Sequence, residues 1–116
     1  MIPPELRQLK TAPIGTEFQL HDDGQDRDVA VLKRADDLYE LRLGIVTKEQ
    51  LKHLRNLLKM DDRSTAYNHT VSRVGDGCKF TFNDPYFIFI LYEPLCAVLG
   101  MPQSLAARIK TPHPDQ

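Results

Sequence analysis

The stretch PYFIFILYEPLCAVLGM, residues 85–101, is the most hydrophobic segment of the chain. Tyr86, Phe87 and Phe89 stand close together at its start, and Tyr92 follows them. A segment this apolar forms either the core element on which the rest of the chain folds or a surface that another molecule covers. It carries no catalytic motif, so it indicates the fold of the chain and not its function.

Two structures compete for residues 85–99. An aspartate before Pro85 is typical of a helix start, and Gly100 with a proline shortly after it is typical of a helix end. The aromatic and β-branched residues of 86–92 favour a strand instead, and Pro94 costs about 3 kcal/mol inside a helix. The pattern therefore leaves open one continuous helix or a strand followed by a short helix from Pro94.

The composition predicts one ordinary globular domain over residues 1–116. Apolar residues make up 41% of the chain and charged residues 27%, and the net charge is −1. Because the chain has no overall basic field, any contact with nucleic acid needs a local basic patch. Residues 1–15 contain three prolines and predict an N-terminal segment with one or two helical turns, and residues 111–116 predict a flexible tail.

Alternating apolar and polar residues predict five short strands. They cover residues 16–20, 29–34, 38–43, 67–74 and 78–82. Gly75-Asp76-Gly77, between the last two, is a strong signal for a hairpin turn. Residues 21–28 between the first two strands hold four aspartates, but their spacing differs from that of a calcium-binding EF-hand. This acidic segment is interpreted as a connecting loop.

The clearest helix covers residues 47–60. Thr47 and Gln50 form the capping-box pattern that starts a helix, and leucines at helical spacing predict its buried stripe. Four cations recur at helical spacing on the opposite face, and they are Lys48, Lys52, Arg55 and Lys59. This basic face is either a solvated outer surface or a contact for a phosphate backbone or an acidic protein surface.

Together these elements predict an α+β fold in the order β-β-β-α-β-β-α, with a five-stranded, mostly antiparallel sheet and the helices packed on one face. This order is similar to that of class I type III secretion chaperones, a topological likeness without a shared motif. The predicted core consists of Phe18, Leu20, Val31, Leu41, Leu43, Leu51, Leu54, Leu58, Val71, Phe80, Phe82, Phe87, Ile88, Leu91, Leu95 and Leu99.

The two cysteines, Cys78 and Cys96, lie among apolar residues and form no CxxC pair, which predicts buried, reduced thiols. The N-terminal residues lack the basic and apolar regions of a signal peptide. The run 85–101 is shorter than a membrane span and contains Glu93 and Pro94. These features predict a cytoplasmic protein that does not enter a membrane.

Residues 95–109 resemble a helix-turn-helix signature. That signature places a small residue four positions before a turn glycine, apolar residues beside the glycine, and two more on a second helix. These places are occupied by Cys96, Leu99, Gly100, Met101, Ala106 and Ile109. The resemblance implies DNA binding and a short helix over 104–110, and plain helix packing is the competing interpretation.

Catalytic signatures are missing from the sequence. There is no GxSxG, no HExxH and no glycine-rich phosphate loop, and the four histidines are scattered. The chain is therefore predicted not to be an enzyme and to need no metal or cofactor. A hydrolase or nuclease with an unrecognised His–Asp site is a weaker alternative.

The leading hypothesis is a small protein that binds a protein partner and occludes or escorts it, as immunity proteins, inhibitors and chaperones do. On a helix, Tyr86, Phe89 and Tyr92 form one stripe, and partial exposure would let them contact the partner or a second copy in a homodimer. The cations of the helix over 47–60 are the second predicted contact. The alternative is a nucleic-acid-binding regulator that uses this helix or residues 95–109.

Overall fold

The computed structural model describes residues 2–22, 25–60, 69–102 and 106–110, with only the backbone of 57–60 and 69. Along the chain the elements are η1 (Pro4–Gln8), β1 (Glu17–Asp22), β2 (Gln25–Ala35), β3 (Leu38–Leu43), α1 (Lys48–Met60), β4 (His69–Val74), β5 (Gly77–Phe82), α2 (Tyr86–Leu99) and β6 (Ala106–Lys110). The predicted α+β fold with an antiparallel sheet is confirmed, and both expected helices are present.

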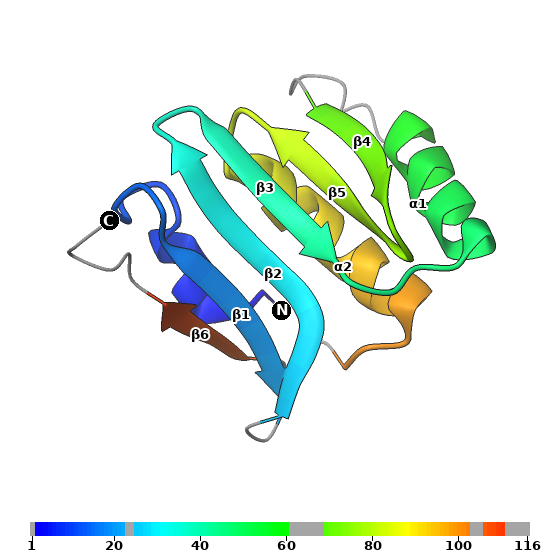
Figure 1. Cartoon of the computed structure of the whole chain (residues 1–116), viewed down its shortest axis with the longest axis horizontal. Coiled ribbons are helices and arrows are strands. Elements are labelled where there is room, and N and C mark those ends of the chain that lie inside the picture. The colour runs from blue at the N-terminus through cyan, green and yellow to red at the C-terminus, as the bar shows by residue number, and fades with distance from the viewer. Residues whose placement is uncertain (1, 23–24, 61–68, 103–105, 111–116) are drawn as a thin grey trace.

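The described strands form one sheet in the order β4-β5-β3-β2-β1-β6, which Figure 1 shows face on. The prediction of five strands is wrong, because Ala106–Lys110 is a sixth strand that pairs with β1. The same finding overturns the short helix over 104–110. Two alanines favour a helix locally, but the edge of β1 offers backbone groups that need partners, and long-range pairing outweighs the local preference.

Strand β2 is longer than expected, since it begins at Gln25 rather than at Val29. The acidic segment is therefore mostly strand and not a loop. Its carboxylates pair with nearby cations: Asp22 lies 3.1 Å from Arg27, and Asp26 lies 3.1 Å from Arg108 of β6. The first pair joins the neighbouring strands β1 and β2, and the second reaches across β1 from β6 to β2, which explains why acidic side chains stand in a β-ladder.

The segment over residues 85–99 is a single helix, which resolves the alternative that the sequence left open. The Asp84 side chain accepts a hydrogen bond from the Tyr86 backbone N–H at 2.9 Å, and Gly100 ends the helix with a left-handed φ of 68°. Pro94 lies inside the helix and has no N–H to donate to the Ile90 carbonyl. Among the described helices, none has the length and hydrophobicity needed to cross a membrane.

One face of the sheet packs against both helices and η1, and this layer holds the core (Figure 1). Almost all predicted core residues are buried there, although Val71 and Leu99 are only partly buried and the side chain of Leu58 lies outside the described residues. The predicted burial of Cys78 and Cys96 is confirmed, and further core residues were not predicted, namely Leu6, Leu9, Val29, Tyr39, Val46, Tyr92 and Ala107. The core thus extends further into the N-terminal segment than the sequence suggests.

The predicted capping box at the start of α1 is confirmed. The Gln50 backbone N–H donates to the Thr47 hydroxyl at 3.1 Å, and the Thr47 backbone N–H donates to the Gln50 side chain at 3.0 Å. The Gln50 side-chain amide also donates to the Val98 carbonyl of α2 at 3.4 Å. One residue therefore both starts α1 and connects it to α2.

The hairpin of β4 and β5 is also confirmed, with Gly75 and Asp76 as the two turn residues between Val74 and Gly77. Gly75 has a positive φ of 55°, which glycine adopts without strain. A Cβ at Gly77 would lie 1.9 Å from the carbonyl oxygen of Leu43. Glycine at this position lets β5 approach the end of β3 and so places the β4 hairpin at the end of the sheet.

Candidate functional site

Helix α1 lies beside β4 at one end of the molecule and also contacts α2 (Figure 1). A groove runs along each of its two flanks. We call them the α1–α2 groove, lined by Glu49, Gln50, His53, Glu93, Pro94, Ala97 and Val98, and the α1–β4 groove, lined by Lys48, Leu51, Lys52, Arg55, Asn56 and Arg73. The two flanks carry charges of opposite sign, so each groove suits a different ligand.

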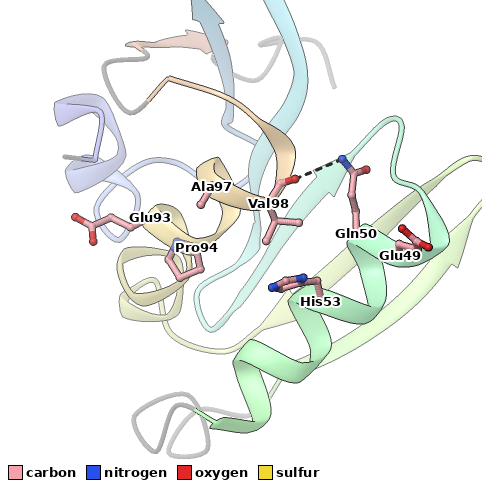
Figure 2. A pocket seen from close by; sticks show the side chains of 7 residues that line it. All are labelled: Glu49, Gln50, His53, Glu93, Pro94, Ala97 and Val98. Atoms are coloured by element: carbon pink, nitrogen blue, oxygen red, sulfur yellow. Dashed lines mark hydrogen bonds between the residues drawn. The ribbon is translucent and has the colours of Figure 1, made fainter.

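The α1–α2 groove has a volume of about 750 Å³. Figure 2 shows the Gln50 side chain reaching from α1 to the Val98 carbonyl, with His53 near the middle of the groove. The carboxylates of Glu49 and Glu93 lie on opposite sides and point away from each other. Because they do not converge, they do not form the closely spaced carboxylate pair that general acid–base chemistry uses. Sequence analysis missed this groove because its two walls lie far apart along the chain.

The α1–β4 groove has a volume of about 500 Å³ and a strongly cationic lining. Lys48, Lys52 and Arg55 contribute from α1, and Arg73 contributes from β4. Of the lining residues that the structure describes, none is a carboxylate or an aromatic residue. Three of these cations were predicted from helical spacing, whereas Arg73 was missed because only the hairpin brings it to the helix.

Most other cations that the structure describes already have partners. Arg42 and Lys79 lie 2.5 Å and 3.6 Å from the carboxylate of Glu40, which is only 3% exposed beneath them, and the cations of β6 pair with carboxylates of β1 and β2. By contrast, no carboxylate within the described ranges lies at ion-pair distance from Lys48, Lys52 or Arg55. The α1–β4 groove therefore gathers three cations that have no ion-pair partner among the described residues, together with Arg73.

Arg73 is held in place by the loop that leads into α1. Its guanidinium donates to the Val46 carbonyl at 2.7 Å, and Val46 itself is buried. Burial raises the pKa of the neighbouring Cys78 thiol, while the positive charges of Arg73 and Arg55 oppose that shift. Arg73 and Arg55 line the same groove, one from β4 and the other from α1.

The predicted aromatic stripe is only partly on the surface. Tyr86 is 54% exposed and packs edge-to-face on the half-buried Phe89, with ring centres 5.7 Å apart. The expectation that Tyr92 is exposed is wrong, because its side chain is only 1% exposed. Steps of three residues rotate by about 60° around a helix, so the third member of the stripe turns into the core. Partner binding by Tyr86 and Phe89 stays a prediction, and the side chain of Lys59 lies outside the described residues.

The helix-turn-helix expectation for residues 95–109 is wrong. The first part is the end of α2, but the chain after Gly100 leads to β6 instead of a second helix. Ala107 is buried in the core and Arg108 forms an ion pair with Asp26, so residues 106–110 are an integral strand of the sheet. A recognition helix that could enter a DNA groove is therefore not formed by 106–110.

Both cysteines are free and buried. Burial is the main cause that raises the pKa of Cys78 and that of Cys96, and a hydrogen bond from Tyr92 only partly opposes the shift at Cys96. The thiols therefore stay protonated near neutral pH, whereas the thiolate is the reactive form. Neither cysteine has the properties of a nucleophile.

We expect these thiols to make the fold sensitive to alkali. Below the thiol pKa of the unfolded chain, about 8.5, their contribution to stability is complete. Above it the unfolded chain releases protons that the folded protein retains, so the free energy of unfolding falls by up to about 1.4 kcal/mol per pH unit for each thiol. Urea unfolding between pH 7 and about 9.5 measures this loss. A Cys78→Ala/Cys96→Ala variant should lose less stability over the same range, and an equal loss would contradict the assignment.

Comparison of the chain with protein families, curated proteins and solved structures finds no match. Its function therefore has to be argued from its own grooves. Within the described part of the chain, no three His, Cys, Asp or Glu residues come together in a way that would hold a metal ion. The α1–β4 groove is the feature with the most distinctive chemistry.

Proposed function

We propose that the chain is a small, non-enzymatic binding protein that holds an acidic surface of a protein partner in the α1–β4 groove and thereby occludes or escorts that partner. The observation that carries this proposal is the gathering of Lys48, Lys52, Arg55 and Arg73 around one groove. Among the described residues no carboxylate forms an ion pair with Lys48, Lys52 or Arg55, and like charges brought together repel each other and weaken the fold. An acidic partner relieves that repulsion, and the charge complementarity steers it to the groove.

The residues of the groove favour binding over catalysis. Its lysine and arginine side chains are cationic hydrogen-bond donors, and Asn56 is a neutral amide. These groups attract and orient an anion by charge and by hydrogen bonds. The other lining residue, Leu51, offers only an apolar contact.

Nucleic acid is the second candidate ligand, because the same cations would neutralise phosphates. Two observations favour protein instead. Among the described residues that line the groove there is no aromatic side chain for a base to stack on, and the overall charge of −1 gives no long-range attraction to a polyanion. A short acidic segment of a protein matches four cations in one groove better than a long phosphate backbone does.

Affinity capture from nuclease-treated lysate of the source cells tests the proposal. Three baits are compared: wild type, a groove variant with Lys52→Glu and Arg55→Glu, and a control variant with Arg7→Glu and Lys10→Glu. The control changes the net charge by the same amount, but on exposed residues outside the groove. We expect wild type and control to retain a protein that the groove variant loses. With the purified partner, the groove variant should bind at least about tenfold more weakly, a difference of 1.4 kcal/mol or more.

Circular dichroism spectra that match among the three baits establish that the variants are folded. Retention of the same protein by the groove variant would show that the groove is not the binding site. Recovery of nucleic acid from lysate without nuclease, with an affinity that falls steeply as salt rises, would instead support the nucleic-acid candidate.

A further inference from the structure

We propose that the segment bound in the α1–β4 groove is an extended, acidic strand of the partner that pairs with β4 and continues the sheet. The inference rests on the proposed function and adds the conformation and charge pattern of the ligand. It is carried by three observations: β4 ends the described sheet, β4 contains no lysine, proline or bulge, and Lys48 and Lys52 of α1 are spaced nearly as side chains on one face of a strand.

Among the described strands, β4 is paired on one side only, with β5. An edge strand of this kind presents a row of backbone N–H and C=O groups that can pair with another chain. Thr70, Ser72, Arg73 and Val74 are all exposed, so side chains on both faces of the strand are accessible. Peptide-binding domains often use such an edge to add a strand from a partner.

The two ends of the sheet differ in how they are protected. Strand β6 carries Arg108 and Lys110, which pair with Asp26 of β2 and Glu17 of β1. Strand β4 has no proline and no lysine, and it pairs with β5 in unbroken register from His69 to Val74. Lysines and prolines are among the usual ways to block edge pairing, so β4 is the less protected edge of the described sheet.

Lys48 and Lys52 of α1 match the repeat of an added strand, whereas Lys52 and Arg55 are separated by a rise of about 4.5 Å. Lys48 and Lys52 are separated by four residues, which is a rise of about 6 Å along the helix axis. Side chains on one face of a strand recur every second residue, at about 6.6 Å. Because α1 runs beside β4 (Figure 1), a strand lying between them can place a carboxylate opposite each successive turn of α1. Arg73 then faces the same row of carboxylates from the β4 side.

The expected ligand pattern is therefore a glutamate or aspartate at every second position, with uncharged β-forming residues between them. The probe is a blocked peptide of alternating glutamate and threonine. Its comparison peptide has the same composition, with all its glutamates at one end. Two further versions carry N-methyl groups on one or the other set of alternate amides, which removes the hydrogen-bond donors from a single edge of the strand.

Fluorescence anisotropy at low salt measures the affinities, and amide chemical shifts locate the peptide. We expect the alternating peptide to bind about tenfold more tightly than its comparison peptide and to shift the amides of residues 69–74. One N-methylated version should lose about tenfold in affinity and the other should bind normally, because only one edge faces β4. The Lys52→Glu/Arg55→Glu variant should bind the alternating peptide about tenfold more weakly, and the Arg7→Glu/Lys10→Glu control should bind it normally.

Equal binding of all four peptides would overturn strand pairing while leaving an electrostatic groove, and with it the proposed function, intact. Absence of binding by the alternating peptide would also overturn the inference, and the capture experiment would still decide separately whether the groove holds a protein. A nuclear Overhauser pattern of helical peptide in the groove would show that the ligand is acidic but not extended.

Discussion

Replacing Phe87 with alanine is expected to lower the free energy of unfolding by about 3–5 kcal/mol, the largest effect of any single truncation considered. The Phe87 side chain is 0% exposed, and its ring centre lies 5.1 Å from that of Phe82 on β5. Truncation removes buried apolar area and leaves a cavity at the contact between α2 and the sheet. Urea unfolding followed by circular dichroism measures the change.

Two neighbouring variants make the result specific to a helix. Ile88→Ala should also cost about 2–5 kcal/mol, because both residues are buried, whereas Tyr86→Ala at the exposed position should cost less than about 1 kcal/mol. In a strand, neighbouring side chains point to opposite faces, so Phe87 and Ile88 would not both be buried on one side. A large cost at Phe87 with a negligible cost at Ile88 would therefore contradict the helix.

Residues 85–99 show which parts of the fold can be predicted from the sequence and which cannot. The signals at the ends of α2, from Asp84 and Gly100, indicated a helix correctly, while the aromatic residues and Pro94 argued against it. Tertiary packing decided between them, because a helix that is buried on several sides gains enough apolar contact to offset a missing hydrogen bond at Pro94. Residues 106–110 show the opposite outcome, since their helical preference was overridden by the edge of β1.

Only the part of the candidate site that lies on α1 could be predicted from the sequence. Lys48, Lys52 and Arg55 follow the helical period, so their common face could be predicted from one segment. Arg73 and the edge position of β4 depend on the order of strands in the sheet, which local patterns do not specify. Tyr92 was misplaced for a related reason, because a three-residue spacing does not stay on one side of a helix.

Lys33 was also missed, because a lysine in a strand is ordinarily assigned to the exposed face. It lies instead on the core side of β2, opposite the buried Tyr39, and is only 5% exposed. Its ammonium donates to the carbonyls of Lys10 and Ala12 at 2.6 Å and 2.8 Å. A buried charge is tolerated when its hydrogen bonds are satisfied, so Lys33 fastens the segment after η1 to the sheet.

Replacing Lys33 with methionine is expected to lower the free energy of unfolding by about 3 kcal/mol. Each hydrogen bond to a charged group contributes about 1.5–3 kcal/mol, and the variant leaves two carbonyls without this donor. Methionine keeps the length and most of the apolar contact of the side chain, so the loss reports the hydrogen bonds rather than a cavity. Urea unfolding measures it, and limited proteolysis should cut the N-terminal segment faster than in wild type.

Arg34→Met is the matched control, because Arg34 is the next residue on the same strand and is exposed. It should change stability by less than about 0.5 kcal/mol and leave the proteolysis rate unaltered. Equal stability of Lys33→Met and wild type would mean that desolvating the ammonium cancels its two hydrogen bonds, as happens in some buried ion pairs. The proteolysis rate separates these cases, since Lys33 attaches the N-terminal segment only if the segment opens when the ammonium is removed.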